Sequence, residues 1–529
     1  MKRFIDDIGR IWAISLLTLF STSCVEWVSL NTQDEREVVV NCVLTETSEQ
    51  ILDLLWSKRN DDEGSFEAIR EATISLFIEE QDDWNLVGNF TCGEDGRWRL
   101  TYRPMYDTRY RLSVVVDGKH KDNEQLYRKY DSSYSNNNFY IRSVDALKGR
   151  SDFLNGLDCS MVSVIEENGG NYIDFDGKVK DFFQLIKENG INLVRVRLWN
   201  DYRSNTGVKG GGCLDIERVL KLALRAKNAG LKFLLDFHYS DNWADPGKQS
   251  CPYSWRNLDF NGAKKELEKF TKNTIEYFIS KGANIDYVQI GNEVNNGFMY
   301  PFGEVDWSDD NTKKNTLDNV AVLFNTAINA VRTSSPNTKI ILHVGDFALK
   351  TWYDNNSRKD VPYGLWFFQQ MEQRRVPYDI AAASFYLFYH HKDDDYLDMN
   401  KMTDSINQFI DTLKKPFMIM EYSMAYTLNP HQFAENQFGR EYSDLIAREY
   451  PTSFQGQVNM ILDIAERVAK AKNRMGIGIC YWGGEWLPVP GAGWGDQYTT
   501  KSSWSNQALF TYEGVATPAL AAMKVVTQG

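Results

Sequence analysis

From about residue 150 onward, short apolar runs alternate with longer segments in which apolar residues recur every three or four positions. A short apolar run bounded by turn residues predicts a buried strand, and the three-to-four spacing predicts an amphipathic helix. Eight such repeats predict a closed (β/α)8 barrel with enlarged loops. The predicted strands are Leu157–Ser160, Leu193–Trp199, Lys232–His238, Tyr287–Gly291, Lys339–His343, Ile380–Tyr386, Phe417–Glu421 and Gly478–Trp482. The predicted helices are Val179–Asn189, Ile216–Ala229, Ala263–Lys281, Thr316–Arg332, Gly364–Arg374, Ser405–Leu413, Gln457–Lys472 and Thr517–Val526.

The chain before residue 150 has a different pattern, with short β-rich runs separated by turns that contain Asp and Gly. Closely spaced short strands predict a small antiparallel β-sandwich. The stretch Lys119–Ser143 is polar and predicts a linker or a loosely packed crossing, and we place the linker at 119–149. The expected fold class is therefore α/β, with a (β/α)8 TIM barrel at 150–529 after a linker at 119–149 and a small all-β sandwich domain at 24–118. The β-rich runs are Val38–Leu44, Ala72–Ile78, Trp84–Phe90, Gly96–Tyr102 and Tyr110–Val116.

Residues 1–23 have the pattern of an export signal. Lys2 and Arg3 precede the apolar run Ile11–Phe20, which is too short to span a bilayer as a permanent helix. The run is followed by Ser21–Cys24, which resembles a bacterial lipoprotein cleavage box and predicts lipidation of Cys24. We expect an exported protein, lipid-anchored at the outer membrane or cell surface of a Gram-negative bacterium. The alternative is an ordinary secretory signal that happens to end near a cysteine.

Composition narrows the classes of partner. The chain has 59 basic and 72 acidic residues, a formal net charge of −13, which disfavours nucleic acid as a partner and is compatible with a neutral polymer. Its 15 Trp and 27 Tyr can stack on sugar rings, although filling a large core is the alternative. The cysteines form no zinc or iron–sulfur spacing; Cys42–Cys92 and Cys213–Cys251 are the pairs that isolated disulfides would join.

Two glutamates come where predicted strands run out into loops. Glu293 ends the run Ile285–Glu293, and Glu421 ends Pro416–Glu421. In a (β/α)8 barrel the carboxyl ends of the strands form the catalytic face, so carboxylates there indicate chemistry rather than packing. Two carboxylates that face one cleft are what glycoside hydrolysis requires, one to protonate the leaving oxygen and one to stabilise or attack the sugar.

Further polar and aromatic residues gather at the ends of other predicted strands. Arg195 and Arg197 lie two positions apart and therefore share one strand face, where they either line the cleft or hold barrel carboxylates. His238, Asp241 and Trp243 lie at the end of the third predicted strand and are candidate substrate-binding residues. An ordinary hydrogen-bonded histidine is the alternative for His238.

The barrel segment resembles glycoside hydrolase family 53, the arabinogalactan endo-β-1,4-galactanases, within the clan of (β/α)8 retaining glycosidases. The resemblance is carried by 176–201, by Asp236–Gln249, by Gln289–Val294 and by the pattern Tyr481-Trp482 with Trp504–Phe510. The resemblance implies that Glu293 is the acid/base and Glu421 the nucleophile, with Asn292 bonded to the sugar 2-hydroxyl.

Roles can also be expected for the residues around these two glutamates. We expect Arg197 to keep Glu421 ionised and the Tyr386 hydroxyl to orient it, while His238 shapes the cleft. The candidate platforms for sugar stacking are Trp243, Trp352, Trp482 and Trp486.

This chain departs from the family at two places. It reads Ser384–Tyr389 after strand six, where relatives often have Ser-Tyr-Tyr-Pro followed by Trp, which affects the shape of one subsite. Some relatives bind a structural calcium ion through an Asp- and His-rich loop after strand seven. The matching loop here, Tyr426–Asn436, is poor in carboxylates, whereas calcium prefers several charged oxygen ligands, so we expect neither this ion nor any other cofactor or metal.

The sequence therefore predicts a retaining endo-β-1,4-galactanase that acts on galactan, as in the side chains of pectin. Another endo-glycanase of the same clan, acting on mannan or xylan, is the alternative enzyme. A surface glycan-binding protein on a catalytically inactive barrel is the alternative of a different class.

Overall fold

The computed structural model describes residues 25–28, 38–42, 49–56, 67–80, 83–102, 108–127, 141–345, 362–387, 399–429, 431, 433–437, 450, 452–493 and 504–528. The chain divides into two compact units, Met1–Tyr140 and Ile141–Gly529. Cys24, the predicted site of lipidation, lies outside the described residues, as does Trp352. No helix in these ranges is long and apolar enough to cross a membrane.

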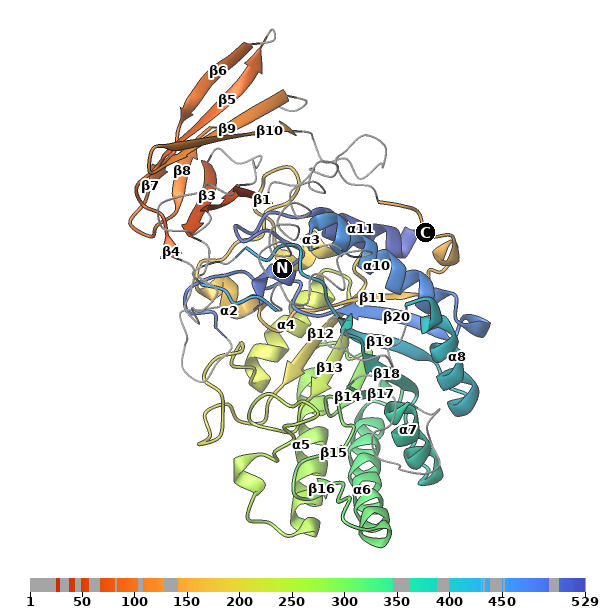
Figure 1. Ribbon diagram of the computed structural model, residues 1–529. Coiled ribbons are helices and arrows are strands. Elements are labelled where there is room, and N and C mark those ends of the chain that lie inside the picture. Colours follow the sequence, from red (N-terminus) through yellow and green to blue (C-terminus); the bar gives the residue numbers. More distant parts are fainter. Residues whose placement is uncertain are drawn as a thin grey trace, which may run out of the picture. The chain divides into compact units, whose positions relative to one another are not determined.

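The second unit contains the predicted closed barrel of eight parallel strands, which pair in chain order (Figure 1). Helices α5, α6, α7, α8, α10 and α11 lie outside the strands, as the amphipathic pattern predicts. The barrel strands are β11 (Leu154–Asp158), β12 (Leu193–Leu198), β13 (Lys232–Phe237), β14 (Tyr287–Ile290), β17 (Lys339–Val344), β18 (Ile380–Ser384), β19 (Phe417–Tyr422) and β20 (Gly476–Tyr481).

The helices start and stop at residues that satisfy their exposed backbone groups. Asp215, Asp259 and Ser453 each accept a hydrogen bond from a backbone N–H of the first turn of the helix that follows. The α-helices are α2 (Val162–Glu167), α3 (Phe182–Glu188), α4 (Ile216–Asn228), α5 (Phe260–Ser280), α6 (Asp310–Ser334), α7 (Tyr363–Gln373), α8 (Met402–Leu413), α10 (Phe454–Ala469) and α11 (Pro518–Gln528). The 3-10 helices are η1 (Asp145–Leu147), η2 (Tyr253–Trp255), η4 (Met399–Lys401), η5 (Lys472–Arg474) and η6 (Ser505–Gln507). A short hairpin, β15 (Gly297–Phe298) and β16 (Gly303–Glu304), lies between β14 and α6.

The inside of the barrel changes from apolar to polar along the strands. Because side chains on one face of a strand recur every second residue, an apolar residue deep in the barrel is followed two positions later by a residue nearer the carboxyl end. On β12, β13, β17 and β18 those later residues are Arg195, Asp236, His343 and Ser384, all buried. The apolar layer beneath them contains Leu154, Leu193, Leu234, Ile341, Ile380, Ala382, Met418, Met420 and Cys480.

The described residues of the first unit form two small antiparallel sheets. Buried residues of both sheets, such as Leu54 on β3 and Leu112 on β9, form one hydrophobic cluster. One sheet has the order β1-β2-β3-β8-β7, with β4 beside β3, and the other has the order β10-β9-β5-β6. The strands are β1 (Val25–Val28), β2 (Val38–Cys42), β3 (Glu49–Trp56), β4 (Glu67–Ala68), β5 (Thr73–Glu80), β6 (Asp83–Asn89), β7 (Thr91–Cys92), β8 (Trp98–Thr101), β9 (Thr108–Val116) and β10 (Lys119–Tyr127).

The predicted linker at 119–149 differs from the structure at both ends. Its first residues form β10, an edge strand that pairs with β9 along its whole length. A polar edge strand buries little side-chain area, so its sequence, KHKDNEQLY, lacks the apolar alternation that predicts a strand. At the other end, Arg142 forms ion pairs with Asp463 and Glu466, and Leu147 is buried, so 141–149 belong to the barrel unit.

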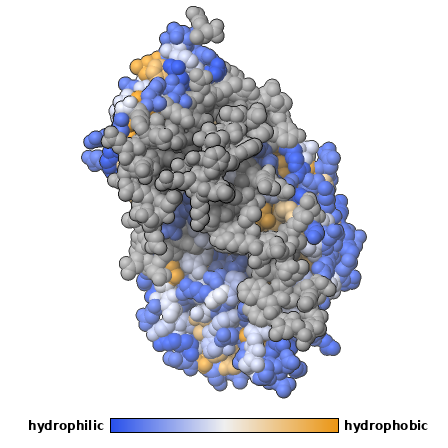
Figure 2. All heavy atoms as spheres, viewed as in Figure 1, coloured by the Kyte–Doolittle hydropathy of each residue, from blue (hydrophilic) through white to orange (hydrophobic). Residues whose placement is uncertain are grey.

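The cysteines and the described surface add two further observations. Cys213 and Cys251 are free cysteines, so the disulfide considered for this pair is absent from the described structure, and Cys92 is also free. Figure 2 shows that the described part of one face is mostly hydrophilic, with hydrophobic residues in small groups.

Candidate active site

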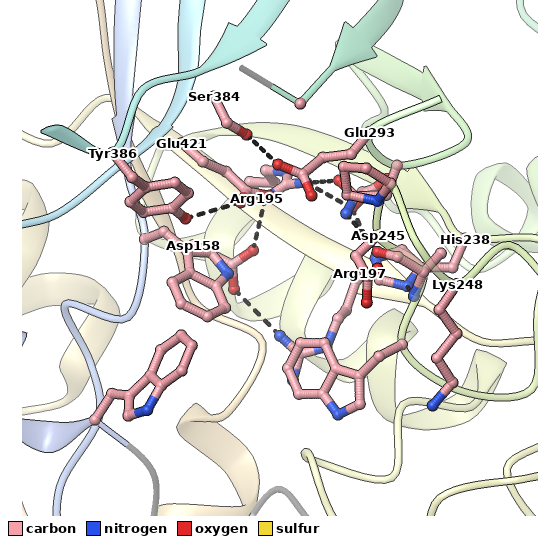
Figure 3. A pocket seen from close by; sticks show the side chains of 18 residues that line it. Asp158, Arg195, Arg197, His238, Asp245, Lys248, Glu293, Ser384, Tyr386 and Glu421 are labelled. Carbon is pink, nitrogen blue, oxygen red and sulfur yellow. Dashed lines mark hydrogen bonds and ion pairs between the residues drawn. The ribbon is translucent and has the colours of Figure 1, made fainter. Parts of the chain in front are cut away.

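A cavity of about 580 Å³ opens at the carboxyl ends of the barrel strands. Both predicted catalytic glutamates line it, Glu293 from the turn after β14 and Glu421 from β19 (Figure 3). The other lining residues are Asp158, Arg195, Arg197, Asp236, His238, Trp243, Ala244, Asp245, Pro246, Lys248, Asn292, Gly345, Ser384, Tyr386, Trp482 and Trp504.

Glu421 lies on the buried strand β19, and two side chains from other parts of the barrel donate hydrogen bonds to it. Arg195 Nη1 lies 2.7 Å from its Oε1, and the Tyr386 hydroxyl donates to its Oε2 over 2.9 Å. The structure thus contains the hydrogen bond that was expected from Tyr386. The pairing of β19 with β18 shifts register between Ile419 and Glu421, and such a bulge re-aims the side chains beside it. As a result Met420 belongs to the apolar core and its neighbour Glu421 lines the cavity.

Glu293 is placed by an unusual turn after β14. Its φ of 49° lies in the left-handed region, which non-glycine residues rarely adopt, and Gly291 two residues earlier has φ 73°. The Val294 N–H donates to the His343 carbonyl over 2.9 Å and fixes this turn against β17. The Ser384 hydroxyl donates to Glu293 Oε1 over 2.5 Å. Arg195 bonds Glu421, whereas no guanidinium of the described residues bonds the Glu293 side chain.

These surroundings separate the two carboxyl groups in acidity. Burial and the nearby charge of Glu421 raise the pKa of Glu293 to about 8, against the effect of the Ser384 hydrogen bond. Burial also raises the pKa of Glu421, but Arg195 and Tyr386 oppose this rise. The negative charge of the pair is therefore better stabilised on Glu421, and the shared proton resides on Glu293. A difference of this kind is what an ionised nucleophile and a protonated acid in one site require.

We expect the alkaline limb of kcat/KM on a polysaccharide substrate to follow the ionisation of Glu293. The general acid works only while protonated, so activity should be retained below a pKa of about 8 and lost as the pH rises through it. A pH profile of kcat/KM measures this. An aryl glycoside whose leaving group needs no proton should show a weaker alkaline limb, and equal limbs on both substrates would contradict the assignment.

The structure corrects the expected role of Arg197. Arg195, not Arg197, contacts Glu421, and it also reaches Asp236 and Asn292 at 2.8 Å each. Arg197 lies two residues further along β12 and donates to the Gly211 carbonyl over 2.5 Å. Its guanidinium also packs 3.9 Å from the centre of the Trp243 ring. Arg197 lines the cavity, so a contact with substrate remains a prediction, but Glu421 is bonded by Arg195.

Asn292 and His238 both lie in the cavity wall and are oriented by backbone groups. Asn292 accepts from Arg195 and donates through Nδ2 to the Ala244 carbonyl over 2.8 Å. The Ala244 N–H donates to His238 Nδ1 over 3.1 Å, which leaves the proton of a neutral ring on Nε2, 3.3 Å from Asp236 Oδ2. Their predicted contacts with sugar stay predictions.

Asp241, which was predicted to bind substrate, is not among the residues that line the cavity. It is 1% exposed, and its carboxylate accepts from the backbone N–H groups of Asp201 and Tyr253 and from the Ser204 hydroxyl. Both oxygens of this buried carboxylate accept from loop donors, which stabilises those loops. We therefore assign Asp241 to the support of the loops after β12 and β13.

Some of the tryptophans predicted to stack on sugar line the cavity, and one does not. Trp243 and Trp482 line the cavity, together with Trp504, which the sequence marked only as part of a C-terminal pattern. Trp486 is 3% exposed and packs against Trp482, with ring centres 4.7 Å apart, so it supports that ring instead of meeting substrate.

The sequence did not identify several buried polar residues that contribute to the site. These residues are Asp158, Asp236, Ser384 and His343. Each occupies the last inward-facing position of its strand or the one before it. A polar residue inside an otherwise apolar strand is the signal that could have identified them, because a buried polar group requires a partner.

The loop after β19 is described only in part, so the expected absence of a calcium ion there stays a prediction. His431 packs 5.0 Å from the Tyr512 ring, and the Asn429 carbonyl accepts from the Tyr512 hydroxyl. No group of three or more His, Cys, Asp or Glu side chains suited to a metal occurs among the described residues.

Comparison with known proteins agrees with this geometry. The family profile described as "Glycosyl hydrolase family 53" matches residues 154–523. An endo-β-1,4-galactanase of Bacillus subtilis is 30% identical over 429 residues, which cover 76% of this chain and 92% of the relative. An arabinogalactan endo-β-1,4-galactanase of Cellvibrio japonicus is 32% identical and covers 68% of this chain and 86% of the relative. The solved GH53 catalytic domain of Ignisphaera aggregans has a TM-score of 0.65 at 33% identity, covering 73% of this chain and 99% of that domain. The chain belongs to glycosyl hydrolase family 53.

Proposed function

We propose that this protein hydrolyses internal β-1,4-galactosidic bonds of galactan and arabinogalactan, including the galactan side chains of pectin, with retention of anomeric configuration. The observation that carries the proposal is the unequal support of two carboxyl groups in one cavity. Glu421 faces a guanidinium and a phenol, whereas Glu293 faces a serine hydroxyl and has a pKa raised to about 8 by burial and by Glu421.

In the first step Glu421 attacks the anomeric carbon while Glu293 donates its proton to the glycosidic oxygen, which leaves with the rest of the chain. Formation of the galactosyl-enzyme removes the charge of Glu421, so the repulsion that raised the pKa of Glu293 falls. Glu293, now ionised, is then suited to take a proton from water, which attacks the anomeric carbon and releases Glu421. Arg195 and Tyr386 hold Glu421 throughout.

Asn292 is the proposed partner of the sugar 2-hydroxyl. Arg195, His343 and Ala244 surround its amide within 2.8–3.0 Å, so its plane is fixed before substrate arrives. A hydrogen bond from a group that needs no rearrangement strengthens most where charge develops, at the transition state. Trp243 and Trp482 are the proposed stacking surfaces.

Digestion of a panel of polysaccharides, with reducing-end detection and product sizing, tests the substrate. We expect short galacto-oligosaccharides from linear β-1,4-galactan and no products from mannan or xylan. Products from mannan or xylan alone would assign the protein to another endo-glycanase activity of this clan. Tight binding of galactan without any product would indicate a glycan-binding protein.

We further propose that the chain is exported, loses residues 1–23 and is lipid-anchored through Cys24 at the outer membrane or cell surface. The two sheets of the first unit would then form a β-sandwich that acts as a spacer or as a sugar-binding module. The substitution Cys24→Ala should move the protein from the membrane fraction to the soluble fraction, and an unchanged distribution would exclude this anchor. Deletion of the first unit, assayed on soluble and insoluble galactan, separates spacer from binding module.

A further inference from the structure

Lys248 is a cation in the cavity wall that the mechanism above does not use. Its side chain is exposed, and no described residue forms a hydrogen bond or ion pair with its ammonium group. By contrast, the two arginines of the cavity are each engaged by carboxylate, carbonyl or ring partners. A lone ammonium group in a sugar-sized cavity offers three hydrogen-bond donors to an incoming ligand.

The turn that carries Lys248 is rigid. Asp245 and Lys248 exchange backbone hydrogen bonds of 3.0 and 2.9 Å, and the Gly247 N–H donates to the Asp245 carboxylate over 2.8 Å. The Gln249 side chain is 2% exposed and donates to the Asp245 carbonyl over 2.9 Å. These hydrogen bonds fix the position of the Lys248 backbone, from which the side chain extends as part of the cavity wall.

The same turn is joined to the general acid. Gln249 Nε2 also donates to the carbonyls of Asn292 at 2.7 Å and Glu293 at 3.3 Å. After burial and Glu421, the Asp245 carboxylate is a further cause of the raised pKa of Glu293. Figure 3 shows Asp245 and Lys248 on the Glu293 side of the cavity, with Tyr386 on the opposite side.

We propose that Lys248 binds the galactosyl unit on the leaving-group side of the cleaved bond, through hydrogen bonds from its ammonium group to sugar hydroxyls. The inference rests on the proposed function, because it takes galactan as the substrate. Glu293 must reach the glycosidic oxygen, so a rigid turn built onto the backbone of Glu293 borders the sugar that departs with that oxygen. Within this turn, the ammonium group of Lys248 is the donor that can reach the hydroxyls of the departing sugar.

The test compares a polysaccharide with a substrate that has no sugar on the leaving-group side. Lys248→Met removes the donor and retains the length of the side chain. Its kcat/KM on linear galactan, relative to that on an aryl β-1,4-galactobioside, should fall about tenfold to a hundredfold, since a hydrogen bond to a charged group is lost. The loss should lie mainly in KM, because the contact is made in both ground state and transition state. Lys248→Arg should restore part of the ratio.

Lys265→Met, on the exposed side of α5 and outside the cavity, is the matched control and should leave the ratio unchanged. An equal loss on both substrates would place Lys248 on the non-reducing side of the bond, or in a purely structural role, and overturn the proposal. No loss on either substrate would also overturn it. If the wild-type enzyme releases no galacto-oligosaccharides, the proposed function fails independently of how Lys248 variants behave.

Discussion

Replacing Glu421 with alanine should lower kcat on galactan by about 10⁴-fold or more, equivalent to about 5.5 kcal/mol of transition-state stabilisation. Removing this carboxylate removes the atom that forms the covalent bond to the sugar. The fold should persist, because Arg195 keeps Asp236 and Asn292 as partners at 2.8 Å. Steady-state kinetics on galactan, with the circular dichroism spectrum as the measure of folding, check this.

Azide supplies the matched control for Glu421→Ala. A small anion can occupy the space of the lost carboxylate and attack the anomeric carbon of an activated aryl galactoside, which would restore turnover and give a galactosyl azide of inverted configuration. Glu293→Ala should give the azide adduct of retained configuration instead. Full activity of Glu421→Ala without azide would exclude Glu421 as the nucleophile.

Replacing Glu293 with alanine should separate substrates by their leaving groups. On galactan, kcat/KM should fall about 10²- to 10⁴-fold, the usual contribution of a general acid. An aryl galactoside with a good leaving group should still form the galactosyl-enzyme at an appreciable rate, because its departing oxygen needs little protonation. Parallel measurement of both substrates at one pH gives the comparison directly.

The same variant should also lose the alkaline limb associated with a pKa of about 8. Glu293→Gln is the control for shape, since it retains a hydrogen-bonding side chain that cannot deliver a proton. An equal loss on both substrates would count against Glu293 as the acid. An alkaline limb that persists unchanged in both variants would assign that limb to another group.

Much of the barrel could be predicted from the sequence because strands and helices there have distinct periods. The start of β12, β13, β14 and β17 agrees with the expected strand starts at Leu193, Lys232, Tyr287 and Lys339. β11 begins at Leu154, three residues before the expected start, because the apolar run at this position is short and gives no clear boundary. β10 was missed for the opposite reason, since its polar residues satisfy backbone pairing without burying an apolar face.

The sequence predicted those residues of the candidate site that could be recognised by their position at the end of a strand. Glu293 and Glu421 were identifiable because carboxyl groups at strand ends share one face of a barrel. Which neighbour serves which carboxyl was not identifiable. Arg195 and Arg197 share a strand face, and only their depth in the barrel decides that the first reaches Glu421 while the second packs on Trp243.

The sequence by itself determined the eight strand-helix repeats, the two strand-end glutamates and the family, since these depend on local period and local motif. The tertiary structure decided the rest. A register shift in β19 turns Glu421 inward, and loop donors from Asp201 and Tyr253 occupy Asp241. The tertiary structure also decided the pKa values of Glu293 and Glu421. Burial and electrostatic interactions depend on distances between residues that lie far apart in the chain.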